Sequence, residues 1–184
     1  MNAPVSVFTP AVLVETAAAR VSTATPCARL ALRARGDLTP FDTALGLSLP
    51  TRIGQRAQSD GIEAICLGPD EWMLQTAEAD AGAIINACAA LYDRQPHSLV
   101  DVSGREVTFE IEGPLAAKLL TLGCPRDIGK IAIGEGRRTL FDGATIVLWC
   151  DAQDRFRMDV WNSFAAHVFS LLETGCRELA AETL

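Results

Sequence analysis

Between residues 98 and 164 the chain carries hydrophobic patterns that restrict it to a small set of folds. In Glu106–Ile111 apolar and polar residues alternate, which is the period of a strand with one buried and one solvated face. The later runs RRTLFD, ATIVLWC and RFRMDVW are also strand-like, and turn residues separate them at Asp142-Gly143 and at 151–154. This order predicts a meander of three consecutive strands.

Two amphipathic helices are predicted beside these strands. Gly113-Pro114 opens the first, because proline is favoured at a helix start, and Gly123 ends it. In the second helix, from about 162 to 179, apolar residues recur with the helical period. The combination predicts an α+β fold with mixed sheets and packed helices. The apolar stripe of the second helix comprises Trp161, Phe164, Ala165, Val168, Leu171, Leu172, Cys176 and Leu179.

The first half of the chain predicts a further group of short elements, each bounded by Gly, Pro or Asp. Alternating apolar residues indicate the strands, and helix-start signals such as Thr39-Pro40 indicate the helices. The predicted elements are a strand at 28–35, a helix from Thr39 to Gly46, strands at 62–67 and 71–74 around Gly68-Pro69-Asp70, a helix after Thr76, and a strand at 99–102 joined through Ser103-Gly104 to the strand at 106–111.

The predicted domain organisation is simple. Residues 1–26 are rich in Ala, Thr, Ser and Pro without a periodic pattern, so we expect an N-terminal arm, either ordered or partly disordered. Residues 27–184 are predicted to form one α+β domain, a size that can bury a sizeable core. The two Gly-Pro pairs, Gly68-Pro69 and Gly113-Pro114, each follow a strand and hint at two pseudo-repeated subdomains.

Composition excludes several classes of partner. A net charge of −7 with scattered basic residues argues against nucleic acid, which requires a clustered positive surface. The longest uncharged helical run, Ala81–Tyr92, is too short to span a bilayer, so no membrane association is expected. The first basic residue is Arg20, so the start lacks the positive region of a secretory signal, and we expect a cytoplasmic protein.

Few residues suggest chemistry. The six cysteines lie more than four residues apart, which argues against a zinc ribbon or redox pair and favours buried free thiols. His97 and His167 are the only histidines, and their placement does not favour a catalytic triad or a metal site. A G-x-G-x-x-G fingerprint is absent, so no dinucleotide cradle is predicted. We therefore predict no catalytic, cofactor-binding or metal-binding residues in this chain.

The candidate site residues are instead interface residues, and they are Trp72, Arg105, Arg137 and Arg138. Trp72 follows two acids and is favoured as a surface anchor, since aromatic residues often anchor interfaces. Trp149 lies in an apolar strand and is favoured as core. The alternative for Arg137-Arg138 is a solvated charge pair. Asp101 could face a ligand, but a carboxylate that binds the amides of the Ser103-Gly104 turn is the commoner arrangement.

An ordered set of short motifs resembles the gamma subunits of heterotetrameric sarcosine oxidases, over roughly Ala28 to the C-terminus. The D-V-S string and the following I-x-G-P with its Leu-rich helix resemble, more distantly, the folate-binding domain of the glycine-cleavage aminomethyltransferase. The motifs are Leu67-Gly68-Pro69-Asp70-Glu71-Trp72, Asp101-Val102-Ser103, Glu112-Gly113-Pro114, Gly123-Cys124-Pro125-Arg126-Asp127-Ile128 and Asp159-Val160-Trp161-Asn162-Ser163-Phe164.

The resemblance implies a folate-binding aminomethyltransferase-like fold and a place in a four-subunit oxidoreductase with alpha, beta and delta partners. Such a complex oxidatively demethylates sarcosine to glycine, produces hydrogen peroxide and transfers the one-carbon unit to tetrahydrofolate. The resemblance implies that FAD, FMN, NAD, tetrahydrofolate and zinc belong to the other subunits. The aminomethyltransferase relatives carry an acid in the strand corresponding to Ala144–Cys150, whereas this chain has none between Asp142 and Asp151. We therefore expect a non-catalytic subunit that stabilises the assembly.

Two alternatives remain open on the sequence. The first is a stand-alone folate-binding one-carbon protein or iron–sulfur-assembly protein of the same fold. The iron–sulfur group carries K-G-C-x-x-G, whereas Gly123-Cys124 is preceded by Leu122 and followed by Pro125. The second is an interaction protein without any role in turnover. Binding of tetrahydrofolate by the isolated chain tests the first, and removal of the chain from the complex tests the second.

Overall fold

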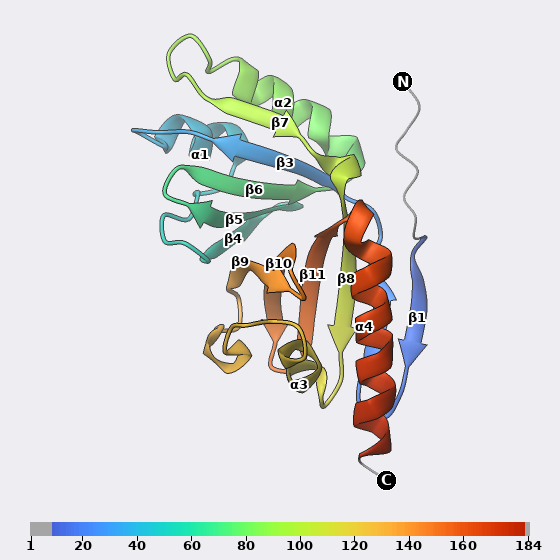
Figure 1. The fold of residues 1–184 in the computed structure, drawn as a ribbon. Coiled ribbons are helices and arrows are strands. Elements are labelled where there is room, and N and C mark those ends of the chain that lie inside the picture. Colours follow the sequence, from blue (N-terminus) through green and yellow to red (C-terminus); the bar gives the residue numbers. More distant parts are fainter. Residues whose placement is uncertain (1–8, 183–184) are drawn as a thin grey trace. The chain divides into compact units, whose positions relative to one another are not determined.

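The computed structural model describes residues 9–182 and divides the chain into two compact units. Unit 1 combines the described part of Met1–Pro26 with Gly104–Leu184, and unit 2 is the segment Cys27–Ser103 between them. Each unit is built on one antiparallel sheet, and Figure 1 shows the helices that accompany each of them. The predicted α+β fold class is confirmed.

Unit 1 contains a six-stranded sheet in the order β1-β2-β8-β11-β10-β9. The predicted meander forms its second half, because β9, β10 and β11 follow one another in the chain and pair in turn. Pairing of β11 with β8 and of β8 with β2 then joins the C-terminal strands to the N-terminal ones. The strands are β1 Ala11–Glu15, β2 Arg20–Thr23, β8 Glu106–Glu112, β9 Gly136–Phe141, β10 Ala144–Ala152 and β11 Arg155–Trp161.

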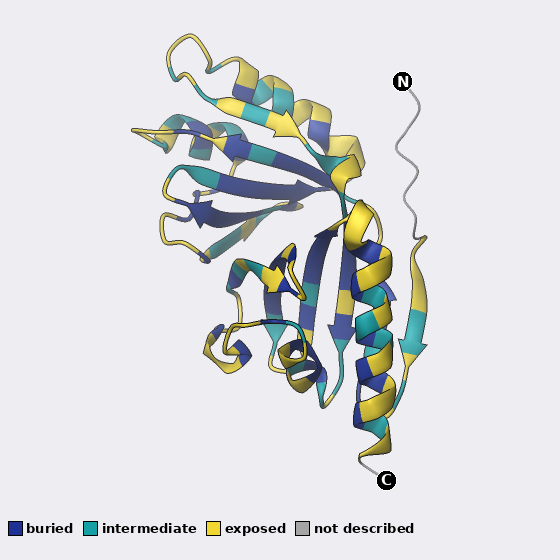
Figure 2. Cartoon of the chain, in the orientation of Figure 1, coloured by how far each residue is buried: buried dark blue, intermediate teal, exposed yellow. Residues whose placement is uncertain are grey.

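The helices of unit 1 are α3 Ala116–Thr121 and the long α4 Asn162–Ala181, with a short 3₁₀ turn at Ile128–Lys130. Another 3₁₀ turn, Ser103–Arg105, spans the boundary in the chain between the two units. Figure 2 shows α4 with alternating buried and exposed stripes along its length. The buried stripe is the predicted one from Ala165 onward, and its members Val168, Leu172, Cys176 and Leu179 are all core residues.

The prediction is wrong at the start of that stripe, because Trp161 and Phe164 are exposed. Trp161 is the last residue of β11, and strand alternation places it on the face opposite to the buried Val160. Phe164 lies in the first turn of α4, of which Asn162 and Ser163 also remain at least partly exposed. The helical period predicted the core stripe but not the point along the helix at which burial begins.

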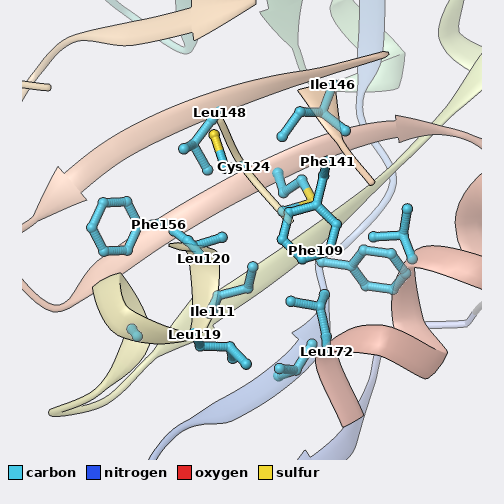
Figure 3. Packing of buried hydrophobic residues seen from close by; sticks show 14 of the residues in the cluster. Phe109, Ile111, Leu119, Leu120, Cys124, Phe141, Ile146, Leu148, Phe156 and Leu172 are labelled. Carbon is cyan, nitrogen blue, oxygen red and sulfur yellow. The ribbon is translucent and has the colours of Figure 1, made fainter. Parts of the chain in front are cut away.

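The core of unit 1 lies between its sheet and these helices. Figure 3 shows Phe109 and Ile111 of β8 packed among residues of α3 and α4, including Leu119 and Leu172. Each of these four side chains is fully removed from solvent. Burial of one such side chain contributes about 1.5–3 kcal/mol, so this cluster contributes strongly to the stability of unit 1.

Unit 2 contains a five-stranded sheet in the order β4-β5-β6-β3-β7. The predicted hairpin around Gly68 is confirmed, since β5 and β6 pair directly. Leu30, Leu32, Phe41 and Leu74 belong to its buried core. The strands are β3 Ala28–Arg33, β4 Arg56–Ser59, β5 Ile62–Gly68, β6 Glu71–Thr76 and β7 Ser98–Asp101, and the helices are α1 Thr39–Leu45, the 3₁₀ turn Glu78–Asp80 and α2 Ala81–Ala89.

The structure differs from the predicted N-terminal arm and from the predicted single domain at 27–184. Residues 1–26 are not simply an arm, because their described part contains β1 and β2, and Val21 of β2 is fully buried; residues 1–8 lie outside the described range. The strands at 98–101 and 106–112 do not share a sheet, because β7 pairs with β3 in unit 2 while β8 pairs in unit 1. The boundary therefore falls at Gly104, inside the predicted domain 27–184.

Within residues 9–182, none of the helices combines the length and the apolar character needed to cross a membrane.

Candidate functional site

Trp72 lies in the middle of unit 2 and is only 2% exposed. It sits opposite Leu32 in the pairing of β6 with β3, and its indole Nε1 donates a hydrogen bond of 2.7 Å to the Pro50 carbonyl oxygen. The side chain therefore belongs to the core, and the exposed surface that its predicted interface role requires is not present.

The two acids that precede Trp72 pair with arginines at the end of the neighbouring strand β3 and just beyond it. Asp70 accepts from Arg35 Nε at 2.8 Å, and Glu71 accepts from Arg33 Nη2 at 3.0 Å. The hydrogen bond from Arg35 holds the pKa of the Asp70 carboxyl below its usual value. The two acids at the turn thus indicate surface ion pairs and do not indicate that Trp72 is exposed.

Arg105 lies near the start of the second segment of unit 1, beside Trp161. Its Nη2 lies 2.8 Å from Glu106 Oε1, and its guanidinium carbon lies 5.5 Å from the centre of the Trp161 ring. The Arg105 side chain is 43% exposed, whereas that of Glu106 is only 6% exposed. The pair therefore presents mainly its cation to the surroundings.

Arg137 and Arg138 lie on β9, an edge strand of unit 1. Arg137 is 19% exposed and binds Glu135 Oε2 at 2.7 Å, while Arg138 is exposed. Neighbouring residues of a strand point to opposite faces, so the two arginines cannot share one patch. Only Arg138 remains as a well-exposed member of this predicted pair.

The turn interpretation of Asp101 is confirmed. Its Oδ1 accepts hydrogen bonds from the amide of Ser103 at 2.9 Å and from the Ser103 hydroxyl at 2.5 Å. The same hydroxyl oxygen accepts from the amide of Arg29 at 2.9 Å. Asp101 thus fixes the end of β7 against β3, which is a structural role.

A buried polar cluster in unit 1 was missed by the sequence reasoning. Asp159 of β11 is 2% exposed, and its carboxylate accepts from the Thr108 hydroxyl and, at 2.6 Å, from the Trp149 indole Nε1. These residues lie on three adjacent strands, β8, β11 and β10. The prediction that Trp149 is a core residue is confirmed, since its ring is fully buried. The available signal was an acid between Met158 and Val160 in an otherwise apolar run.

The buried cluster has an ion pair at its edge. Arg157 Nε lies 2.7 Å from Asp151 Oδ2, and its guanidinium carbon lies 4.9 Å from the Trp149 ring centre. A buried carboxylate that accepts two hydrogen bonds from adjacent strands is held in one position and is shielded from solvent. The arrangement of Asp159 is suited to holding strands together and is unsuited to proton transfer with a substrate.

The prediction of buried free thiols is confirmed for five of the six cysteines, and Cys27 is half-buried. Burial raises the pKa of the Cys66 and Cys88 thiols. Burial, together with the nearby Glu173, raises the pKa of Cys176 to about 11. These thiols are therefore protonated at neutral pH and are poor nucleophiles.

Labelling of the native chain with iodoacetamide at pH 8 should follow this order. A thiol with a pKa of about 11 has a thiolate fraction of roughly 10⁻³ at that pH, so Cys176 should react far more slowly than Cys27. Mass spectrometry of peptides over time measures the two rates, and labelling in urea provides the control in which all six cysteines react. Equal native rates for Cys27 and Cys176 would contradict the described burial.

Among residues 9–182, no group of three or more His, Cys, Asp or Glu side chains is arranged to hold a metal ion. His167 Nε2 lies 2.8 Å from Asp142 Oδ2 on the surface, and His97 Nδ1 lies 2.7 Å from the Gln95 carbonyl oxygen.

Unit 1 also carries an open groove of about 760 Å³ whose walls include Ile128, Ile133 and Phe156. The same walls also include the polar residues Gln153 and Asp154.

Comparison with solved structures defines the class of fold. A chain of the heterotetrameric sarcosine oxidase from Corynebacterium sp. U-96, in complex with pyrrole 2-carboxylate, superposes with a TM-score of 0.81 at 23% identity, covering 92% of this chain and 89% of that chain. Aminomethyltransferase T of the glycine cleavage system from Bartonella henselae gives 0.63 at 13% identity, covering 85% and 46%. The chain is an α+β protein with the aminomethyltransferase type of fold.

Curated relatives then define the family. The sarcosine oxidase gamma subunit of Corynebacterium sp. strain P-1 is 30% identical over 152 residues, which is 80% of this chain and 73% of the relative. The gamma subunit of strain U-96 is 28% identical over 75% of this chain and 68% of that subunit. No protein-family model matches the chain. This chain belongs to the family of sarcosine oxidase gamma subunits, as its motifs predicted, and its relatives are subunits of an oxidoreductase.

Proposed function

We propose that this chain is a non-catalytic gamma subunit that stabilises a cytoplasmic sarcosine oxidase complex with alpha, beta and delta subunits. Family membership supports the place in such a complex. The main support for a non-catalytic role is the commitment of Asp159, whose carboxylate is buried and bound by Trp149 and Thr108. The protonated state of the Cys66, Cys88 and Cys176 thiols supports the same role.

The complex is proposed to demethylate sarcosine oxidatively to glycine, to form hydrogen peroxide and to transfer the one-carbon unit to tetrahydrofolate. FAD, FMN, NAD, tetrahydrofolate and zinc are assigned to the other subunits. The composition of β10 supports this assignment for folate, because Ile146 and Leu148 fill the core and no acid lies between Asp142 and Asp151. A strand of this composition offers no side chain to position an amine or move a proton.

Purification of the tagged chain from its native cells tests this proposal. We expect a yellow complex that contains further subunits and produces peroxide when sarcosine is added. The matched control is the same complex prepared without this chain. We expect this control to be less stable than the full complex but to retain its intrinsic turnover. A colourless single chain that binds tetrahydrofolate in titration would overturn the proposal in favour of an independent folate protein.

A further inference from the structure

The open groove of unit 1 is lined by the start of α3, the segment 128–133 and the turn that joins β10 to β11. Its wall residues all belong to unit 1, and most of them are apolar. Phe156 is buried, whereas Ile133 is 65% exposed. Figure 3 shows the Phe156 ring at the margin of the drawn core, away from the rings of Phe109 and Phe141. The apolar wall therefore continues from the core onto the surface.

The surroundings of Phe156 repeat an arrangement that unit 2 forms around Trp72. In unit 2, Cys66 pairs with Trp72 across a hairpin whose register shifts after the cysteine. In unit 1, Cys150 pairs with Phe156 across a hairpin with the same kind of shift. Phe156 therefore holds in unit 1 the position that Trp72 holds in unit 2, and the neighbours of the two residues can be compared.

The segments beside the two aromatic residues correspond, but they are bound differently. In each unit a glycine donates its amide to the carbonyl oxygen of that cysteine, Gly54 at 2.7 Å and Gly134 at 2.9 Å. The segment before Gly54 is tied to Trp72, whose indole donates to the Pro50 carbonyl oxygen at 2.7 Å. A phenyl ring cannot donate such a bond, and the segment before Gly134 lines the open groove instead. The groove thus lies beside a position at which unit 2 places a larger aromatic ring.

The turn before each aromatic residue carries an aspartate in the same backbone setting. The Asp70 carbonyl oxygen accepts from the Ala34 amide at 3.2 Å. In the same way, the Asp154 carbonyl oxygen accepts from the Gly113 amide at 2.9 Å. Ala34 directly follows β3, and Gly113 directly follows β8, the strands that pair with β6 and β11. Asp154 is therefore the counterpart of Asp70.

The carboxylate of Asp70 has cationic partners from its own unit. Its Oδ2 accepts from Arg35 Nε at 2.8 Å, and its Oδ1 lies 3.3 Å from Arg33 Nη1. These arginines lie on either side of the amide donor that binds the turn. On either side of the corresponding donor, unit 1 has Glu112 and Pro114, which carry no positive charge. Pro114 is itself a wall residue of the groove.

The Asp154 side chain lines the groove, and within residues 9–182 no cation pairs with it. Arg155 follows it in the sequence, but strand alternation places that side chain on the face opposite to Phe156. Lys130, in the segment that lines the groove, pairs with Asp127 at 3.3 Å. The groove therefore combines an apolar wall with a carboxylate that lacks the cation present at its counterpart in unit 2.

We propose that the groove binds a segment of another subunit of the sarcosine oxidase complex, in which a basic residue lies beside a large apolar side chain. The basic residue pairs with Asp154, as Arg35 pairs with Asp70 in unit 2. The apolar side chain packs against Phe156 and Ile133. This proposal rests on the proposed function as a subunit. A small molecule is a poorer occupant, because pockets for such ligands cover about 70–90% of the ligand surface, whereas this wall is open to solvent.

Reconstitution with the remaining subunits tests the proposal, using the double variant Ile133→Ser/Asp154→Lys, which changes two exposed residues of the groove. We expect the dissociation constant to rise at least about 30-fold, as for loss of an interface hot spot. The matched control is Ile53→Ser/Asp93→Lys, which makes the same changes at exposed residues of unit 2 and should bind like wild type. Circular dichroism verifies that each variant is folded. An equal rise in the control would contradict a role specific to the groove.

A single substitution tests the missing cation directly. Pro114→Arg gives unit 1 the arginine that unit 2 has at the corresponding position, and this side chain should pair with Asp154 in place of the partner's basic residue. We expect the dissociation constant to rise about tenfold and its salt dependence to weaken. Pro114→Ala is the matched control and should bind like wild type.

The outcomes separate this inference from the proposed function. Binding of the double variant and of Pro114→Arg with wild-type affinity would overturn the groove inference while leaving the subunit assignment intact. Self-association of the wild-type chain that the double variant loses would also overturn it, because the occupant would then be a second copy. Failure of the wild-type chain to bind the other subunits would instead overturn the proposed function.

Discussion

Gly113→Ala should destabilise unit 1 by about 3–5 kcal/mol, combining backbone strain with a steric clash. Gly113 has a φ of +132°, a conformation that residues with a Cβ atom rarely adopt. A Cβ atom at this position would lie 2.9 Å from Ala19 Cα and 3.0 Å from the Ala18 carbonyl oxygen. Both neighbours are backbone atoms of buried residues, so neither can rotate away.

The clash matters because Gly113 lies where three segments meet. Its amide donates to the Asp154 carbonyl oxygen at 2.9 Å, and the amide of Leu115 donates to the Ala18 carbonyl oxygen at 2.9 Å. Displacing Ala18 and Ala19 would therefore disturb the link between β1 and β2 as well as the start of α3. Urea unfolding of the full chain, followed by tryptophan fluorescence, measures the loss.

Gly134→Ala provides the matched control for this prediction. Gly134 has a φ of +81°, but a Cβ atom there would meet nothing within 4 Å. The control therefore retains the conformational strain without the clash and should cost only about 1–2 kcal/mol. If Gly113→Ala were no more destabilising than Gly134→Ala, the close approach of residues 18–19 to Gly113 would be wrong.

The sequence predicted elements whose signals are local. The meander of β9, β10 and β11 follows from apolar alternation and from turn residues such as Asp142-Gly143. The core stripe of α4 follows from the helical period. The turn role of Asp101 follows from the short reach of its carboxylate to the Ser103 amide. In each case the interaction joins residues close in the chain.

Features set by pairing between distant segments were not predictable in this way. β2 has only four residues, and its burial depends on pairing with β8, some ninety positions later. The sequence around Gly113-Pro114 indicates a helix start, but nothing local shows that residues 18–19 approach it. Sequence proximity to acids suggested an exposed Trp72, whereas pairing of β6 with β3 buries it.

The sequence did not predict the buried carboxylate of Asp159. Replacement of this residue is the second change with a large expected effect on stability. Asp159→Ala should destabilise unit 1 by about 3–5 kcal/mol, because it removes the acceptor of both the Thr108 hydroxyl and the Trp149 indole N–H. A buried hydrogen-bond donor that loses its acceptor lowers the free energy of unfolding by more than the hydrogen bond itself contributed, since water cannot replace the lost partner. Urea unfolding of the full chain measures this loss by circular dichroism, which does not depend on Trp149 fluorescence.

A double-mutant cycle separates this effect from simple loss of packing. Trp149→Phe retains most of the buried ring but removes the N–H that donates to Asp159 at 2.6 Å. In the wild-type background this change should cost about 1–3 kcal/mol, whereas in the Asp159→Ala background it should cost much less, because the donor is already unpaired. A coupling energy near zero would show that the indole and the carboxylate do not depend on each other. A clear coupling would identify Asp159 as a buried acceptor that ties β10 and β8 to β11, which is the role expected of a carboxylate committed to structure.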